Sequence, residues 1–498
     1  MKKIVFAIAL ILGAGSMLMS SCKSYDDESN STIENNEAVN TVFRFNSSDV
    51  VIVNSRSAED SGEHEQGTEA ECLVNSVRLY LFDSKEKTLA ATMALKNLKR
   101  TTEVDNTASV IYTSDRVAAP LGTFDIFAVA NNDDFIASDT EEEFLNSINN
   151  IKYKEGNITD IKDGIMMTNR GNSNLNVNIQ KFDDPTKMNT ITINLERTIA
   201  RIDISVDKES YPLKNGVGNV FASIKLNDYY IVNLPTSFYN FRHTAVLTDL
   251  TPTEWSLDKN FGKIADVNGY VIDPYFFKKS TSAAEFKNQD NYYVNFFSDF
   301  SKDQMQWNAL TPGKYITSYS LENCMIQPAQ KNGYTTGVVF RGEIIPSADN
   351  TFIVGSDGAL MAVDPYNYDK IYLFNYKFYA SLAALEKAGV KIKDGMSAQD
   401  LAFLDVTVYE KENGKFATYY KYWIRHLDNH QDLVMGVMEF SIVRNNLYRV
   451  SVKDILNPGP GKPSFDPIPD DPDEGEIRLK VEINVMPWQV RSQEQIIL

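Results

Sequence analysis

The sequence has few of the side chains on which most catalytic and metal sites depend. It holds 4 histidines and 3 cysteines among 498 residues, and it contains neither the GxSxG nor the HExxH motif. Candidates for acid–base catalysis and metal ligation are therefore scarce. We expect a protein that is not an enzyme and that uses no metal or other cofactor.

Basic residues are also in deficit, because 49 Lys and Arg stand against 67 Asp and Glu, a formal net charge of −18. Nucleic acid binding needs a basic surface, so nucleic acid is excluded as a partner. The apolar run Ile4–Leu18 is short for a membrane span and follows Lys2 and Lys3, which is typical of a signal peptide. Residues 1–22 end in Met19-Ser20-Ser21-Cys22, which resembles a lipobox with Cys22 as the lipidated residue. Ordinary signal cleavage, with Cys22 incidental, is the alternative.

The two other cysteines, Cys72 and Cys324, lie far apart in the sequence. An exported protein could pair them. Sequence spacing does not show whether their Cα atoms approach, so two unpaired thiols and one disulfide both stay open.

Aromatic residues are plentiful, with 25 tyrosines and 27 phenylalanines, which favours a β-rich fold. Short strand patterns separated by turns predict a first β-sandwich over residues 57–214. A break near Tyr211–Gly218 marks the expected boundary, and a second, larger sandwich covers residues 215–457 with an insertion at Leu250–Phe300. The expected strands of the first domain are Asn75–Phe82, Gly122–Ala130, Thr190–Leu195 and Thr198–Val206, with one short helix from Thr140 to about Ile148.

Thr41–Ser57 holds a strand in an unusual setting. Its apolar runs, Val42–Phe45 and Val50–Val53, follow a polar tether and end at Arg56, and a second polar, acidic run extends to Glu71. A segment with a clear strand pattern is thus flanked by flexible polar segments and followed by a basic residue. We assign residues 23–56 to this tether and strand.

Residues 458–498 form the last segment. Pro458–Gly475 is a Pro/Asp/Gly linker without a core of its own. Ile477–Val485 then alternates apolar and polar residues, and the parity changes at Pro487, so that Trp488 and Val490 continue the apolar face. This region is either a strand for another subunit or the last strand of its own sandwich.

Three further patterns have two interpretations each. His426-x-x-x-His430 could ligate a metal but follows a strand pattern, so a polar turn is favoured. Acidic residues in 470–474 could bind calcium weakly or be a solvated linker. The aromatic residues Tyr419, Tyr420, Tyr422 and Trp423 could line a sugar-binding surface, and packing on a sheet is the favoured alternative.

Several motifs in this order resemble the FimA-like and minor-fimbrium shaft pilins of Bacteroidales. Besides the lipobox and the strand before Arg56, they are Leu195-Glu196-Arg197-Thr198-Ile199-Ala200-Arg201-Ile202-Asp203, Tyr319-Ser320-Leu321-Glu322-Asn323, Val443-Arg444-Asn445-Asn446-Leu447-Tyr448 and Val485-Met486-Pro487-Trp488.

The resemblance implies a mainly β chain of two transthyretin-like β-sandwich domains with short helices, a removable N-terminal propeptide strand and a C-terminal donor strand. The precursor would be an outer-membrane lipoprotein made by the lipoprotein-processing machinery. An arginine-specific protease would cut between Arg56 and Ser57. The removed strand would carry Phe43, Phe45, Val51 and Val53, and the donor strand would carry Ile483, Val485, Trp488, Val490, Ile496 and Leu498.

The function implied is a pilin that polymerises head-to-tail with identical or related subunits into surface fimbriae. Such fimbriae serve adhesion to host or bacterial surface ligands, colonisation and biofilm formation. A fimbrial tip or accessory subunit is the alternative within the family. A monomeric surface lipoprotein that binds glycans is the alternative from another class.

Overall fold

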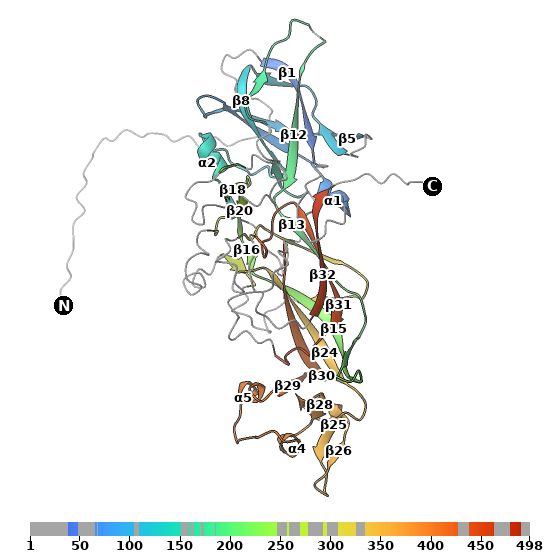
Figure 1. Ribbon diagram of the computed structural model, residues 1–498. Coiled ribbons are helices and arrows are strands. Elements are labelled where there is room, and N and C mark those ends of the chain that lie inside the picture. Colours follow the sequence, from blue (N-terminus) through green and yellow to red (C-terminus); the bar gives the residue numbers. More distant parts are fainter. Residues whose placement is uncertain are drawn as a thin grey trace, which may run out of the picture.

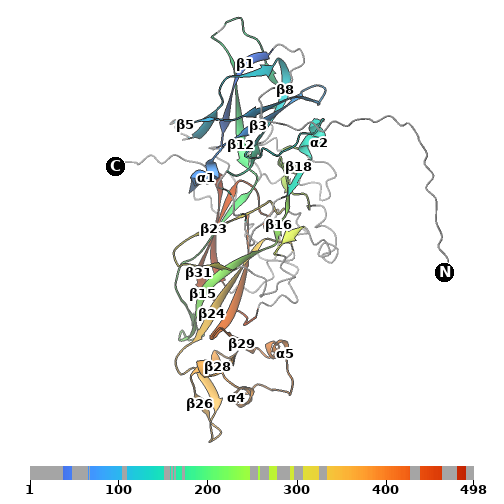
Figure 2. The same ribbon diagram turned by 180° about the vertical axis from the view of Figure 1, so that it is seen from behind.

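The computed structural model shows an elongated, mainly β protein with a few short helices (Figures 1 and 2). The residues that it describes are 38–47, 65–66, 68–103, 109–150, 158, 161, 164–170, 174–184, 186–246, 256–257, 269–276, 292–295, 307–324, 334–426, 438–462 and 479–489. Among them, no helix has the length and apolarity needed to cross a membrane.

One end of the molecule is a sandwich built from ten strands (Figure 1). Along the sheet the order is β4-β3-β8-β10-β12-β1-β6-β5, with β11 paired to β8 and β7 paired to β1. The strands are β1 (Ala38–Asn46), β3 (Val77–Asp83), β4 (Leu89–Leu95), β5 (Lys99–Glu103), β6 (Ser109–Thr113), β7 (Val117–Pro120), β8 (Gly122–Ala130), β10 (Met167–Asn169), β11 (Val177–Ile179) and β12 (Asn189–Arg197). Helix α2 (Glu141–Leu145) begins at Thr140, whose side chain accepts a hydrogen bond from the Glu143 N–H.

The second sandwich packs a five-stranded sheet on a ten-stranded sheet. The first has the order β2-β32-β31-β13-β23, with β2 (Glu65–Gln66), β32 (Leu479–Gln489), β31 (Asn446–Ile455), β13 (Ala200–Val206) and β23 (Ile316–Ser320). The other runs β14-β15-β24-β30-β29-β27-β28-β25-β26. Its strands are β14 (Tyr211–Lys214), β15 (Val220–Val232), β24 (Gly337–Pro346), β25 (Thr351–Val354), β26 (Leu360–Ala362), β27 (Lys370–Phe374), β28 (Lys377–Tyr379), β29 (Thr407–Glu412) and β30 (Lys415–Trp423), with β22 (Asn308–Ala309) beside β15.

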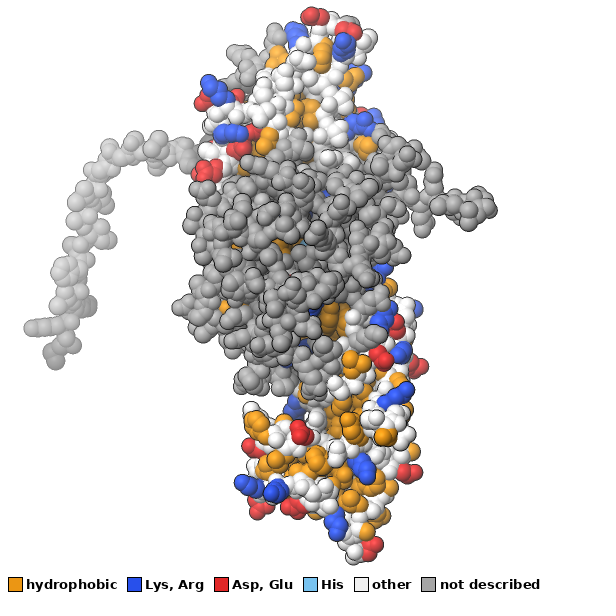
Figure 3. All heavy atoms as spheres, in the orientation of Figure 1, with side chains coloured by type: hydrophobic (Ala, Val, Ile, Leu, Met, Phe, Trp, Pro, Cys, Tyr) orange, Lys and Arg blue, Asp and Glu red, His pale blue; other side chains and the backbone are white. Residues whose placement is uncertain are grey.

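Smaller elements complete the chain. The far end of the molecule, opposite β1, holds α4 (Leu382–Lys387), α5 (Ala398–Ala402) and the 3-10 helix η4 (Pro365–Asn367) (Figures 1 and 2). Exposed apolar side chains gather over this end (Figure 3), among them Met361 and Phe403. Short pairs join β9 (Ile148–Asn150) to β17 (Ser237–Tyr239) and β16 (Leu234–Pro235) to β21 (Tyr293–Val294), and β18 (His243–Val246) lies between β19 (Ser256–Leu257) and β20 (Gly269–Ile272).

The chain crosses between the sandwiches earlier than the sequence predicts. Strand β13 was expected in the first domain, within residues 57–214. It pairs instead in parallel with β31 and antiparallel with β23, and β14 also lies in the second sandwich. The crossing is therefore the short segment between β12 and β13, and the Tyr211–Gly218 break is a turn region inside the second sandwich.

The start of the Pro-rich linker is packed on the second sandwich. The carbonyl of Gly459 accepts a hydrogen bond from the Tyr409 hydroxyl at 2.8 Å, and the Pro460 carbonyl accepts one from the Tyr419 N–H at 3.0 Å. A Cβ atom at Gly461 would meet the Val408 carbonyl oxygen well inside van der Waals contact. Glycine is needed there because the two backbones approach closely.

Replacing Gly461 by alanine should therefore destabilise the protein by about 1–3 kcal/mol, because the backbone of β29 must move to admit a methyl group. Gly216→Ala is the matched control, since a Cβ atom at Gly216 would meet nothing within 4 Å. Urea unfolding of both variants measures the difference. Equal stability of the two variants would show that the linker is not packed on β29.

Candidate functional site

Strand β1 lies inside its sheet although it comes first in the chain. It pairs in parallel with β12 from Thr41↔Asn189 to Asn46↔Asn194. On its other side it pairs antiparallel with β7 through residues 38–41 and with β6 through residues 44–46. Sheet order runs β12-β1-β6, so β1 joins two parts of the sheet that would otherwise present open edges.

The strand forms because its side chains alternate between core and surface. Thr41, Phe43 and Phe45 are fully buried, while Val42 and Arg44 between them are half-buried. Phe43 and Phe45 belong to the first sandwich's core, together with residues such as Leu79 of β3, Tyr112 of β6, Ile126 of β8 and Ile193 of β12. Fully burying side chains of this kind stabilises a fold by about 1.5–3 kcal/mol each.

Ser114, in the turn between β6 and β7, completes the backbone pairing of β1. Its hydroxyl accepts a hydrogen bond from the Phe43 N–H at 3.0 Å, and its own N–H donates to the Phe43 carbonyl at 2.9 Å. Buried backbone groups without partners are costly. The slot that β1 fills therefore needs an extended chain both to cover its apolar side chains and to satisfy its backbone.

Helix α1 (Glu69–Cys72) anchors the chain that follows this strand at the junction of the sandwiches. Thr68 and Glu71 form a capping box, with each side chain bonded to the other residue's N–H. The Glu71 carboxylate is fully buried and accepts from Arg201 of β13 at 3.1 Å and from the Tyr319 hydroxyl of β23 at 2.6 Å. Arg197 donates to the Glu71 carbonyl at 2.8 Å. Breaking a buried ion pair by removing one partner costs about 3–5 kcal/mol, so α1 is held firmly.

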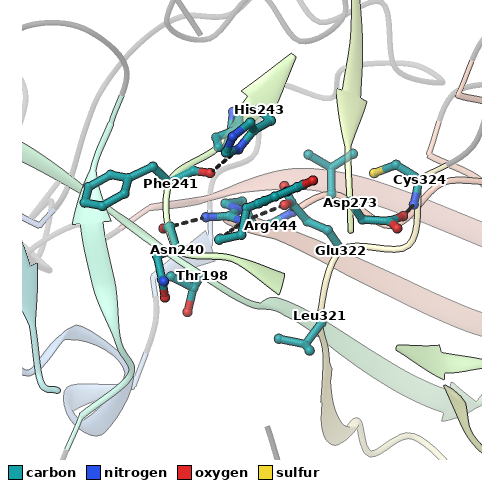
Figure 4. A network of polar contacts seen from close by, with 12 residues as sticks. Thr198, Asn240, Phe241, His243, Asp273, Leu321, Glu322, Cys324 and Arg444 are labelled. Atoms are coloured by element: carbon teal, nitrogen blue, oxygen red, sulfur yellow. Dashed lines mark hydrogen bonds and ion pairs between the residues drawn. The ribbon is translucent and has the colours of Figure 1, made fainter. Parts of the chain in front are cut away.

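A second buried network holds the chain just before β31 at the same junction (Figure 4). Arg444 is fully buried and donates to the Glu322 carboxylate at 2.6 Å and to the carbonyls of Tyr239 and Asn240 at 2.7 and 3.2 Å. Nearby, Arg242 pairs with Glu196 at 2.6 Å. Burial raises the pKa of Glu196, and Arg242 opposes that rise.

Three of the sequence motifs meet in these networks. Arg197 from the first motif reaches the side-chain oxygen of Asn445 at 3.2 Å, and Glu322 from the second binds Arg444. Arg201 also makes two bonds of 2.8 Å to Asp203. The motifs thus supply the buried charges that join the sandwiches, a role that sequence spacing alone did not reveal.

Strand β32 lies in its own sandwich. It pairs antiparallel with β31 from Ile455↔Leu479 to Asn446↔Pro487, which is the alternative that the sequence left open. Ile483, Val485 and Trp488, predicted as donor residues, all fall within β32. The predicted residues Val490, Ile496 and Leu498 lie outside the described part of the chain.

The remaining predicted site residues also lie partly within and partly outside the described part of the chain. Phe43 and Phe45 of the predicted removable strand lie in β1, whereas Val51, Val53, Arg56, Ser57 and Cys22 lie outside the described residues. Cys72 and Cys324 are buried and not bonded to each other. Of the predicted aromatic surface, Tyr419, Tyr420 and Trp423 are buried, which confirms packing as their role.

The metal hypothesis at His426 gains no support. Its Nδ1 lies 2.8 Å from the Tyr448 hydroxyl, and the ring is buried, whereas His430 is outside the described residues. Within the described residues, no cluster of His, Cys, Asp and Glu side chains could hold a metal ion.

Two family models match the chain. Residues 47–201 match the family described as "Major fimbrial subunit protein (FimA)", and residues 412–494 match "Major fimbrial subunit protein type IV, Fimbrillin, C-terminal". Over these stretches the chain is similar to the major fimbrial subunit families. The expected resemblance is thereby confirmed. Both matched stretches include elements described above, β12 in the first and β31 with β32 in the second.

Several solved structures are distantly similar to this chain. A fimbrilin (FimA) from Porphyromonas gingivalis is 14% identical with a TM-score of 0.43, over 91% of this chain and 99% of that one. A putative cell adhesion protein from Parabacteroides distasonis is 12% identical with a TM-score of 0.42, over 92% and 99%. The tip fimbrial protein Mfa3 from P. gingivalis is 11% identical with a TM-score of 0.35, over 90% and 100%. No curated protein matches the chain.

If β1 completes the first sandwich, truncating its inward side chains should strongly destabilise the uncut chain. Phe43→Ala and Phe45→Ala should each cost about 3–5 kcal/mol, because each leaves a cavity in the core. Val42→Ala is the control from the half-buried face and should cost less than about 1 kcal/mol. Urea unfolding of the three variants tests this, and a small loss for both phenylalanines would mean that β1 does not complete this core.

The buried histidines predict acid sensitivity. Burial lowers the pKa of His426 to about 4 and that of His243 to about 4. Because these folded-state values lie below the pKa of about 6.5 in an unfolded chain, the unfolded state binds more protons between these limits. The contribution to stability is complete above pH 6.5 and is lost as the pH falls toward 4.

In the His426→Gln variant, the difference between the number of protons bound by the unfolded state and by the folded state should be smaller by one. The slope of unfolding free energy against pH between 6 and 4.5 should fall by up to about 1.4 kcal/mol per pH unit. Chemical unfolding at several pH values measures the slope. An unchanged slope would mean that His426 is not held neutral in the folded protein.

Proposed function

We propose that this protein is a fimbrial subunit whose strand β1 is temporary and is replaced by a strand from a neighbouring subunit. The observation that carries the proposal is the position of β1. It is a fully paired inner strand with two buried phenylalanines, yet it is joined to the rest of the chain only through the segment that contains Arg56. One cut in that segment separates β1 covalently from the fold that it completes.

Cleavage between Arg56 and Ser57 fits this arrangement better than cleavage at the other nearby arginine. Arg44 lies in the middle of β1, and the pairs Arg44↔Thr192 and Arg44↔Thr113 place it between two strands. A protease needs an accessible, extended substrate, and exposed polar segments are the usual sites of nicking. An arginine-specific protease would therefore cut the chain after Arg56 and leave β1 whole.

Loss of β1 would open a slot with an unsatisfied backbone on both sides and an apolar floor. An extended segment of another chain fits such a slot, because main-chain hydrogen bonds supply affinity and side-chain pockets supply specificity. The contact between donor and slot joins two different surfaces of the subunit, and a contact of that kind builds a fibre when it does not close. We place the donor in the region that ends with Val490, Ile496 and Leu498.

The donated part is best taken from residues after β32. Ile483 and Val485 are paired with Val450 and Tyr448 of β31, so donating them would require the second sandwich to open. The precursor would reach the cell surface as an outer-membrane lipoprotein anchored through Cys22, and the assembled fimbriae would serve adhesion, colonisation and biofilm formation.

The alternative of a surface glycan-binding monomer has less support, because its aromatic candidates Tyr419, Tyr420 and Trp423 are packed inside the protein. A fimbrial tip or accessory subunit is the alternative within the family, and it would differ from a shaft subunit in the partners with which it assembles. The family matches to major fimbrial subunits favour a position in the shaft.

Arg56→Ala should block the cut and leave a lipidated monomer with β1 in place. Arg44→Ala is the matched control and should be cut and assembled as the unchanged chain is. N-terminal sequencing of surface-extracted protein measures the cleavage. The size of the protein on a gel after mild heating measures the polymerisation. Normal polymers from Arg56→Ala, or loss of cutting in Arg44→Ala, would contradict the proposed cut site.

A further inference from the structure

The chain just after the propeptide and the chain just before the C-terminal tail lie side by side. Strand β2 pairs in parallel with the last two residues of β32, in the register Glu65↔Trp488 and Gln66↔Gln489. We call this pairing the clasp. In Figure 1 both the label of α1 and the C-terminal end of β32 lie at the junction of the two sandwiches.

Both sides of the clasp are fixed to the same sheet. Gln66 is two residues from Thr68, which begins α1, and α1 is held through Glu71 to Arg201 of β13 and Tyr319 of β23. β32 is held through its pairing with β31, which is itself paired with β13. The clasp therefore joins two segments that are both held to β13. It lies downstream of Arg56, so the proposed cut does not remove it.

Strand β32 also contributes to the core of the second sandwich. Leu479 is buried in the same cluster as Ile202, Val450 and Ile455, and Val481 packs against that cluster. Withdrawing β32 would uncover these side chains and break its ladder with β31. The clasp holds the C-terminal end of β32 against β2, and this pairing opposes fraying of β32 from that end.

We infer that the clasp fixes where the donated tail begins: β32 stays in its own sheet up to Gln489, and only the chain beyond it enters the neighbouring subunit. The inference rests on the proposed function and specifies which part of the C-terminal region moves. The structural basis is the juxtaposition of β2 with the end of β32 and the anchoring of both to β13.

A reversible cross-link tests this directly in the full chain. Gln66→Cys with Gln489→Cys places two thiols on Cα partners of adjacent strands, which lie about 4.8 Å apart, within the range that a disulfide spans. The buried Cys72 and Cys324 are changed to alanine in every variant. Gln66→Cys with Lys480→Cys is the control, because Lys480 lies at the other end of β32, roughly 30 Å from Gln489.

The 66–489 pair should cross-link in the uncut monomer, and the 66–480 pair should not. After cutting, the locked protein should polymerise within about twofold of the rate of the same protein kept reduced. Absence of the 66–489 cross-link, or equal cross-linking of the control, would overturn the clasp. A locked protein that stays monomeric while the reduced form polymerises would overturn the inference and leave the proposed function intact.

Failure of the unaltered, cut chain to polymerise would instead overturn the proposed function, and the inference with it. Hydrogen exchange on the unaltered chain gives a second readout that needs no substitution. The amides of Trp488 and Gln489 should exchange equally slowly in the monomer and the polymer. A more than tenfold change between the two states would contradict a clasp that stays closed.

Discussion

The fold of the first sandwich depends on one constraint: an inner position of its sheet must be filled by an extended chain. Strand β1 fills it, with β12 on one side and β6 and β7 on the other. An edge strand can be lost without opening a sheet, whereas an inner strand leaves two unpaired edges and an uncovered core. The proposed function follows from three states of that position: occupied by β1, empty after β1 is removed, and occupied by a strand from another subunit.

The buried charges at the junction have a complementary role. Glu71, Arg201 and Tyr319 hold α1, and Glu322 with Arg444 holds the turn before β31. Buried ion pairs of this kind contribute little net stability compared with apolar packing, and they impose a defined geometry because each partner is costly to leave alone. They hold α1 and the chain that enters β31 in a defined position at the junction of the two sandwiches.

Much of the local structure could be predicted from the sequence. Gly122–Ala130 forms a strand with the bounds expected from its apolar run. The Asn413-Gly414 pair, a typical hairpin sequence, forms the turn between β29 and β30, with positive φ at both residues. The apolar run Val42–Phe45, expected to form a strand, lies within β1. These signals are local, because side-chain period and turn chemistry act over a few residues.

Features set by distant contacts could not be predicted in this way. The partners of β13 are β31 and β23, more than a hundred residues away, and nothing in its own sequence assigns it to the second sandwich. The same holds for the clasp, where residues more than 400 positions apart pair. A similar case is the apolar segment from Phe378 to Ala388, where Phe378 pairs with Leu373 in β28 before α4 starts at Leu382.

Hydrogen exchange across the slot is the most direct test of the account. The amides of β12 from Thr190 to Asn194, and those of β6, would be followed in the uncut chain, in the cut chain after β1 has been removed, and in assembled fimbriae. The account predicts slow exchange in the uncut chain, fast exchange once β1 is gone, and slow exchange again in the fimbriae. Equal protection in all three states would contradict the claim that β1 fills a slot that another subunit later occupies.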